Sequence, residues 1–145
     1  MPHYTWSHRV SFGECDPAGV VYFPRYFEWF HEAMEEWFDV ELGVPYAQVL
    51  QRFGFPAVRT QAEFRAPCKM GEIVSVELRV GHSTRSSLQL DYRVLGPSGG
   101  LRATGATTVV MVGVVSGEAD HFLSVTIPEE LRQRIDAFAQ GLRPA

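Results

Sequence analysis

The sequence has little of several features that would place a protein in a specialised class. Its only cysteines, Cys15 and Cys68, form no C-x-x-C pair, so we expect neither a disulfide framework nor a paired-thiol motif. The 13 Lys and Arg against 17 Asp and Glu give a net charge of −4, which provides no basic field for nucleic acid. No apolar run approaches the roughly 18 residues that span a bilayer, and no basic stretch followed by an apolar run marks a signal peptide. These absences predict a cytoplasmic protein that binds neither nucleic acid nor membrane.

What is present suits one globular domain. The hydrophobic share of 46% and the charged share of 21% are ordinary for such a protein. A chain of 145 residues is long enough for one core and short for two, so we expect residues 1–145 to form a single domain. Lys69 is the only lysine, so the cationic side chains are nearly all arginines, which suit phosphate and carboxylate ligands. A bias in overall amino-acid composition would explain the same preference for arginine over lysine.

The hydrophobic pattern predicts a strand, a long helix, four strands and a final helix. Residues 4–12 alternate as a half-buried strand does, with Trp6, His8, Val10 and Phe12 on one face. From Pro24 to Leu42, apolar residues recur at three-and-four spacing, which predicts a core helix that Gly43 ends. The later strands are expected at 57–65, 74–80, 88–94 and 101–115, and the last helix at 128–138.

These elements predict an α+β fold. Short turns between the later strands predict that they follow one another as an antiparallel meander. One long apolar helix with such a sheet curled around it would bury the aromatic stripe of the helix. The exposed edge of the sheet favours self-association.

A carboxylate in a Pro/Gly turn just before the long helix is the first candidate for chemistry. Asp16 lies seven or eight residues before the helix start, where backbone N–H groups lack partners inside the helix. A carboxylate near such donors could attack a carbonyl while an N–H of Tyr22 or Phe23 holds the resulting oxyanion. Gly19 would let the backbone pass close to a ligand. The alternative is structural: Asp16 could simply accept backbone N–H bonds in an Asx-turn.

Other polar residues offer weaker alternatives. Cys15 could act as a nucleophile if a base such as His8 or His31 ionised it, although a buried, inert cysteine is the more frequent case. His31, inside the helix, is expected to be a packed or surface residue. The polar turn at residues 82–85 could hydrogen-bond a ligand or could be a solvated hairpin tip. No His/Cys/Asp cluster has metal-ligand spacing, so no metal is expected.

The segment from Phe12 to Tyr26, FGECDPAGVVYFPRY, resembles the signature of hot-dog-fold acyl-CoA thioesterases. It is most similar to the 4-hydroxybenzoyl-CoA thioesterase branch and also similar to the Tol-Pal-associated bacterial thioesterases. The resemblance extends over about residues 5–128, but only the part from Asp16 to Tyr26 is specific. It implies the hot-dog fold, in which an antiparallel sheet wraps around one long central helix, and subunits that pair as homodimers and assemble further into homotetramers.

The resemblance also implies roles for individual residues. Asp16 matches the catalytic carboxylate, as nucleophile or as base for water, and the amide of Phe23 matches the donor that polarises the thioester carbonyl. Gly19 matches the position that lets the acyl group approach, and Tyr22 is expected to bind substrate with it. Arg85 matches a basic residue near the nucleotide phosphates, although the neighbouring basic residues of that branch are missing here. The Tol-Pal-associated relatives usually carry a histidine where this chain has Phe23, and that difference favours the aryl-CoA branch.

The leading hypothesis from the sequence is therefore an acyl-CoA thioesterase that prefers an aromatic acyl group such as 4-hydroxybenzoyl or benzoyl, as in aromatic degradation. Coenzyme A would be part of the substrate, and no separate cofactor is expected. Two alternatives remain open. The chain could hydrolyse short or medium fatty acyl thioesters of CoA or an acyl-carrier protein, or it could bind acyl-CoA without catalysis. A dehydratase is disfavoured because no suitable histidine motif is present.

Overall fold

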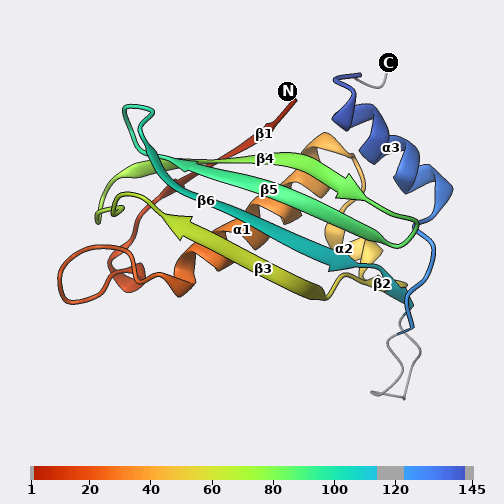
Figure 1. Cartoon of the computed structure of the whole chain (residues 1–145), viewed down its shortest axis with the longest axis horizontal. Helices are drawn as coiled ribbons and strands as arrows, with labels where there is room; N and C mark the ends of the chain where they lie inside the picture. Colours follow the sequence, from red (N-terminus) through yellow and green to blue (C-terminus); the bar gives the residue numbers. More distant parts are fainter. Residues whose placement is uncertain (1, 114–122, 143–145) are drawn as a thin grey trace.

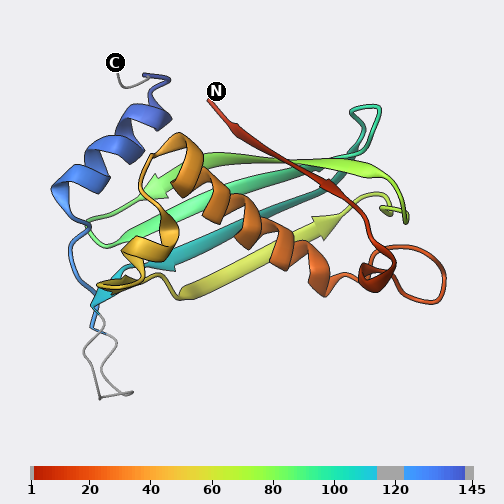
Figure 2. The same cartoon turned by 180° about the vertical axis from the view of Figure 1, so that it is seen from behind.

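The computed structural model describes residues 2–113 and 123–142, which form a five-stranded antiparallel sheet with one long helix against its face (Figures 1 and 2). The strands are β1 (Tyr4–Arg9), β2 (Phe53–Gly54), β3 (Ala57–Phe64), β4 (Ile73–Ser83), β5 (Ser87–Leu95), β6 (Leu101–Val110) and β7 (Val112–Gly113). The helices are α1 (Pro24–Glu36), α2 (Tyr46–Val49) and α3 (Glu129–Ala139), with a 3-10 turn η1 (Phe12–Glu14) and a π-helical turn η2 (Trp37–Glu41). The expected α+β arrangement is confirmed.

Helix α1 is the central element because its apolar stripe is wide and continuous. Pro24 occupies the first helical position, where its missing N–H costs nothing. The helix continues through η2, where the Leu42 N–H donates to the Trp37 carbonyl at 3.0 Å, and Gly43 follows with φ +68°. The expected helix from Pro24 to Leu42 is thus confirmed apart from its widened last turn. Its buried side chains are Tyr26, Trp29, Phe30, Ala33, Met34, Trp37 and Phe38.

The order of strands in the sheet corrects the expected meander. The order is β1-β4-β5-β6-β3, so only β4, β5 and β6 are consecutive neighbours, and β3 pairs with β6 at the edge. The connection at residues 65–72 therefore crosses the end of the sheet. Its eight residues can span about 26 Å, whereas three strand spacings amount to about 14 Å. Arg102 fastens the crossover by donating to the Pro67 carbonyl at 2.7 Å and to the Glu72 carboxylate at 2.9 and 3.0 Å.

The ion pair at this crossover leads to a prediction about pH. Hydrogen bonds from Arg102 and from the Lys69 N–H hold the pKa of Glu72 below its ordinary value. A carboxyl with a lowered folded-state pKa contributes stability that is full above its unfolded pKa, about 4.3, and is lost as the pH falls through the folded pKa. We expect Glu72→Gln to unfold at a lower urea concentration than the wild type near pH 7. The difference between the two unfolding midpoints should become smaller below about pH 4. A difference of equal size at both pH values would contradict this account.

Two of the predicted strands are shorter in the structure. The first ends at Arg9, and Phe12 lies in η1 with 83% of its surface exposed, so the prediction that Phe12 shares a strand face with Trp6 and His8 is wrong. The strand expected at 101–115 is divided at Met111 into β6 and β7, and positions 114 and 115 lie outside the described residues. Within residues 2–113 and 123–142, no helix combines the length and apolar character that a bilayer crossing requires.

Gly105 in β6 allows α1 to pack directly on the sheet. A Cβ there would overlap the ring of Phe30, which is itself stacked on Tyr92 at 4.5 Å. We expect Gly105→Ala to destabilise the protein by about 1–3 kcal/mol through overpacking, which lowers the melting temperature by roughly 3 °C per kcal/mol. Gly100→Ala is the matched control, because a Cβ at Gly100 meets nothing within 4 Å. Equal melting temperatures for the two variants would contradict the prediction.

Candidate functional site

The loop between β1 and α1 (Figure 2) carries the candidate catalytic residues. Hydrogen bonds of its own backbone hold it in place. The Asp16 N–H donates to the Val20 carbonyl at 2.9 Å, and the Gly19 N–H donates to the Asp16 carbonyl at 3.0 Å. Gly19 has φ +78°, a conformation that favours glycine. The Val21 N–H donates to the Cys68 carbonyl at 2.9 Å, which fixes the loop to the crossover connection. The turn that presents Asp16 is therefore a fixed structure.

The side chain of Asp16 makes the Asx-turn that the structural alternative expected. Its Oδ1 accepts the Ala18 N–H at 2.9 Å, and the residue is half-buried. The bond uses one carboxylate oxygen, and Oδ2 has no hydrogen-bond partner among the residues that the structure describes. The structural and catalytic interpretations are therefore compatible, because the Asx-turn orients the carboxylate and leaves one oxygen for a ligand.

The amide of Phe23 is the available donor at the start of α1. The Tyr22 N–H donates to the Glu14 carbonyl at 2.9 Å, and Pro24 has no N–H. The Phe23 N–H has no acceptor within the described part of the chain, and it lies at the positive end of the helix dipole. Of the two amides considered from the sequence, the one at Phe23 is thus available and the one at Tyr22 is engaged. Tyr22 instead contributes a half-exposed ring.

An aromatic cluster lies beside this donor. The Phe23 ring is edge-on to Phe64 of β3 at 6.2 Å and to Tyr22 at 5.4 Å, and Phe64 also contacts Tyr26 at 5.0 Å. Phe23 and Phe64 remain 55% and 48% exposed, so their faces are open to a ligand or a partner. The sequence pattern placed Phe64 on a strand but had no signal for its proximity to Phe23, because the two are brought together by the sheet edge.

Glu14 is a functional candidate that the sequence reasoning missed. Its carboxylate accepts the Trp29 indole N–H at 2.7 Å, the His8 Nε2 at 2.7 and 2.9 Å, and the Ser11 backbone N–H at 2.9 Å. Burial alone would raise the pKa of Glu14, but the bonds from Ser11, Trp29 and His8 outweigh it and hold the pKa below its ordinary value. The spacing of Ser11 and Glu14 is that of a capping box, which was the available sequence signal.

The rival residues are not prepared for catalysis. Burial, together with the carboxylates of Glu14 and Asp16, raises the pKa of the Cys15 thiol, which disfavours the thiolate that a nucleophile needs. His31 lies exposed on α1, 3.9 Å from Glu35. It is therefore a surface residue, as expected.

The turn between β4 and β5, which contains Arg85, lies at the opposite end of the sheet from the loop between β1 and α1 (Figure 1). It follows the end of β4, whereas Ile73 at the start of β4 pairs with Arg9, close to the Asp16 loop. Ten residue steps along β4 amount to about 33 Å, so one chain does not bring Arg85 and Asp16 together. A second arginine, Arg132 of α3, was missed from the sequence. It donates to the Ser83 hydroxyl at 3.1 Å and to the Thr84 carbonyl.

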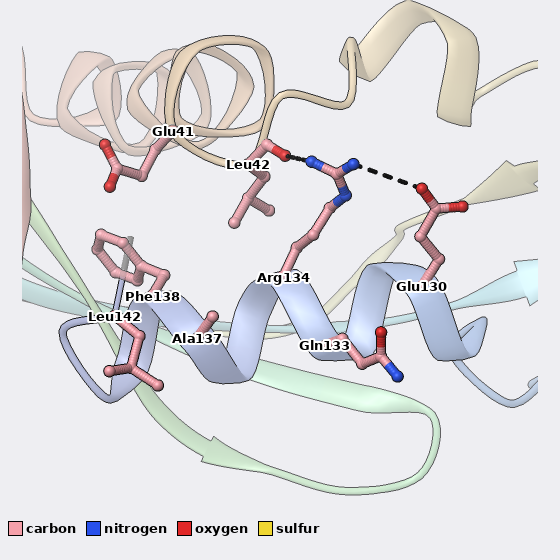
Figure 3. Close-up of a pocket in the computed structure, with 8 residues that line it drawn as sticks. All are labelled: Glu41, Leu42, Glu130, Gln133, Arg134, Ala137, Phe138 and Leu142. Carbon is pink, nitrogen blue, oxygen red and sulfur yellow. Dashed lines mark hydrogen bonds and ion pairs between the residues drawn. The ribbon is translucent and has the colours of Figure 1, made fainter. Parts of the chain in front are cut away.

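A separate hollow of about 390 Å³ lies between α3 and the end of η2 (Figure 3), and no residue of the Asp16 loop lines it. Arg134 reaches across from α3 to donate to the Leu42 carbonyl at 2.7 Å and to contact Glu130 at 3.4 Å. Phe138 and Leu142 line the other side. This hollow is a packing groove between two elements, bridged by one arginine. Within the described ranges, no group of three His, Cys, Asp or Glu residues is arranged to hold a metal ion.

Comparison with known proteins identifies relatives of this chain. The family model described as the thioesterase-like superfamily matches residues 10–135. A 1,4-dihydroxy-2-naphthoyl-CoA hydrolase of Prochlorococcus marinus is 32% identical over 77 residues, which are 48% of this chain and 51% of the relative. A 4-hydroxybenzoyl-CoA thioesterase of a Pseudomonas species is 32% identical over 87 residues, which are 57% of this chain and 61% of the relative. The chain thus spans about half to three fifths of the length of these curated relatives.

A solved structure agrees with these matches over a greater length. The structure of a gentisyl-coenzyme A thioesterase superposes with a TM-score of 0.80 and 26% identity. The superposition covers 91% of this chain and 99% of that one.

Proposed function

Because the chain belongs to the thioesterase-like superfamily and has its hot-dog fold, we propose that it is a thioester hydrolase that converts an acyl-CoA into a free acid and coenzyme A. The observation that carries this proposal is the loop between β1 and α1. It holds two groups that have no hydrogen-bond partner among residues 2–113 and 123–142: one carboxylate oxygen, Asp16 Oδ2, and one donor, the Phe23 N–H. These are the two groups that acyl transfer from a thioester needs, a nucleophile or base and an oxyanion donor.

The proposed reaction follows from these two groups. The thioester carbonyl oxygen accepts the Phe23 N–H, which stabilises the negative charge that develops as the carbonyl carbon is attacked. The attacking oxygen belongs either to Asp16 or to a water molecule from which Asp16 takes a proton. The C–S bond then breaks and coenzyme A leaves as the thiol. In the first route, water hydrolyses the acyl–Asp16 anhydride, so both routes consume one water molecule.

We propose an aromatic acyl group, of the 4-hydroxybenzoyl or benzoyl type. The edge-on cluster of Tyr22, Phe23 and Phe64 beside the donor would pack against a flat ring, since aromatic pairs favour such geometry. The relatives named above act on naphthoyl, hydroxybenzoyl and gentisyl thioesters, all of which carry a hydroxylated ring. This shared chemistry supports a hydroxylated aryl-CoA more strongly than an alkyl chain.

We further propose that two copies of the chain pair through β3 and assemble into a tetramer. Strand β3 is an edge of the sheet, and its side chains Val58 and Phe64 are 62% and 48% exposed. Antiparallel pairing of two β3 edges about a twofold axis would bring the β4–β5 end of one copy towards the Asp16 end of the other. Arg85, with Arg132 beside it, would then reach the phosphates of a coenzyme A bound at the partner's loop.

The deciding experiment is thiol release measured on a panel of aryl-CoA, alkyl-CoA and acyl-carrier-protein thioesters. We expect kcat/KM to be highest for hydroxylated aryl-CoA esters. Highest values for alkyl or carrier-protein esters would favour the fatty acyl alternative. Saturable acyl-CoA binding without thiol release from any ester would contradict the proposed activity and favour a binding protein.

A further inference from the structure

The side chain of Glu14 connects the Asp16 loop to the central helix. Trp29, its donor at 2.7 Å, is a core residue of α1 with 1% of its surface exposed. His8 of β1 holds the same carboxylate from the other side and is stacked on Trp6 at 4.8 Å. Glu14 is therefore fixed between a strand and a helix that are themselves part of the core, and Asp16 follows only two residues later.

The backbone of Glu14 controls the other end of the same loop. Its carbonyl accepts the Tyr22 N–H at 2.9 Å, and Phe23 is the next residue along the chain. This bond engages the Tyr22 donor and closes the loop immediately before the Phe23 N–H, the donor that has no acceptor in the part of the chain that the structure describes. One residue thus anchors both sides of the loop, the side that carries Asp16 and the side that carries the oxyanion donor.

From this double attachment we propose that Glu14 is a positioning residue, which holds the Asp16 carboxylate and the Phe23 N–H in the geometry that thioester hydrolysis requires. The inference rests on the proposed function. Glu14 itself does not touch the reacting atoms in this scheme. It acts by fixing the two groups that do, and displacement of a reacting group by about 1 Å can cost on the order of 100-fold in rate.

Glu14→Gln tests the role with little change in size. An amide keeps one acceptor oxygen but replaces the other with a donor, so it cannot accept from His8, Trp29 and Ser11 together. We expect kcat to fall on the order of 100-fold with KM changed by less than about threefold, because the loop still forms the substrate surface but presents it imprecisely. Trp29→Phe removes a single donor and keeps an aromatic ring at this position, so we expect a smaller fall of kcat. Because the smaller ring leaves a cavity in the core, its melting temperature is measured alongside.

The matched control is Asp39→Asn. The Asp39 carboxylate accepts the Tyr46 N–H at 2.7 Å, near the other end of the helix. It is a comparable carboxylate-to-backbone bond with no connection to the loop. Because the asparagine oxygen can still accept the Tyr46 N–H, we expect this variant to stay close to the wild-type melting temperature and to retain the wild-type kcat. If Asp39→Asn loses as much kcat as Glu14→Gln, or if Glu14→Gln retains the wild-type kcat, the positioning role is refuted.

Amide hydrogen exchange separates this inference from the proposed function. In the wild type, the amides of Asp16, Gly19 and Tyr22 all donate within the loop. We expect Glu14→Gln, but not Asp39→Asn, to lose protection at these amides. This measurement does not require turnover. Absence of thiol release in the wild type would therefore refute the proposed thioesterase activity but would not by itself decide how Glu14 holds the loop. Unchanged protection in Glu14→Gln would refute the positioning role.

Discussion

Replacing Asp16 by Asn is expected to lower kcat for aryl-CoA hydrolysis by about 1,000-fold, within the range that loss of a general base produces. Asparagine has the same shape and keeps an amide oxygen that can accept the Ala18 N–H, the bond that Oδ1 makes in the wild type. It has no negative oxygen to attack a carbonyl or to take a proton from water. The turn should therefore survive while the chemistry is lost. Thiol release under saturating substrate measures this directly.

Stability and binding provide the controls for Asp16→Asn. We expect its melting temperature to stay within about 2 °C of wild type, because a substitution that keeps the local bond changes stability by less than about 0.5 kcal/mol. We also expect acyl-CoA to bind with similar affinity, since the variant removes a transition-state contribution. Hydrolysis that persists near the wild-type rate would show that Asp16 is neither nucleophile nor base.

Phe23→Pro should produce the second large effect. Proline has no N–H, so it deletes the one donor at the start of α1 that lacks a partner within the described residues. The φ of Phe23 is −53°, close to the value that a proline ring imposes. Loss of one oxyanion donor costs on the order of 100- to 1,000-fold in kcat, or about 3–4 kcal/mol in the barrier. The same thiol-release assay measures it.

Phe23→Ala separates the backbone donor from the aromatic ring. It removes the ring that contacts Tyr22 and Phe64 but keeps the N–H. We expect this variant to raise KM for aryl esters more than it lowers kcat. The difference in kcat between the proline and alanine variants therefore measures the contribution of the Phe23 N–H. Equal kcat in the two variants would mean that the Phe23 amide does not stabilise the oxyanion.

Local signals predicted most of the elements of this fold. The apolar stripe from Pro24 to Leu42 identified the central helix, and Gly43 marked its end, because both depend on neighbours within one or two turns. The pairing of β3 with β6 could not be predicted in this way. Turn residues between β3 and β4 resemble those of a hairpin, and only the geometry of the whole sheet shows that residues 65–72 form a crossover.

In the candidate site, too, the residues that are close in sequence could be predicted and those brought together by the fold could not. Asp16, Gly19 and Phe23 are close in sequence, so their motif could be recognised without coordinates. Phe64 and Arg132 reach their neighbours from distant elements, and their proximity was therefore not predictable. The distance between Arg85 and the Asp16 loop likewise follows from the direction of β4, which no short motif encodes.

The crossover also has a consequence for synthesis of the protein on the ribosome. Strand β3 emerges before residues 65–100 have been made, yet its partner β6 begins at Leu101. At roughly 5–20 residues per second, the nascent β3 waits for several seconds with both of its edges unpaired. Val58 and Phe64 stay exposed even in the folded chain, so during that interval a chaperone or a β3 on a neighbouring nascent chain can reach them. Translation speed through the β4 and β5 codons would then influence the yield of correctly folded protein.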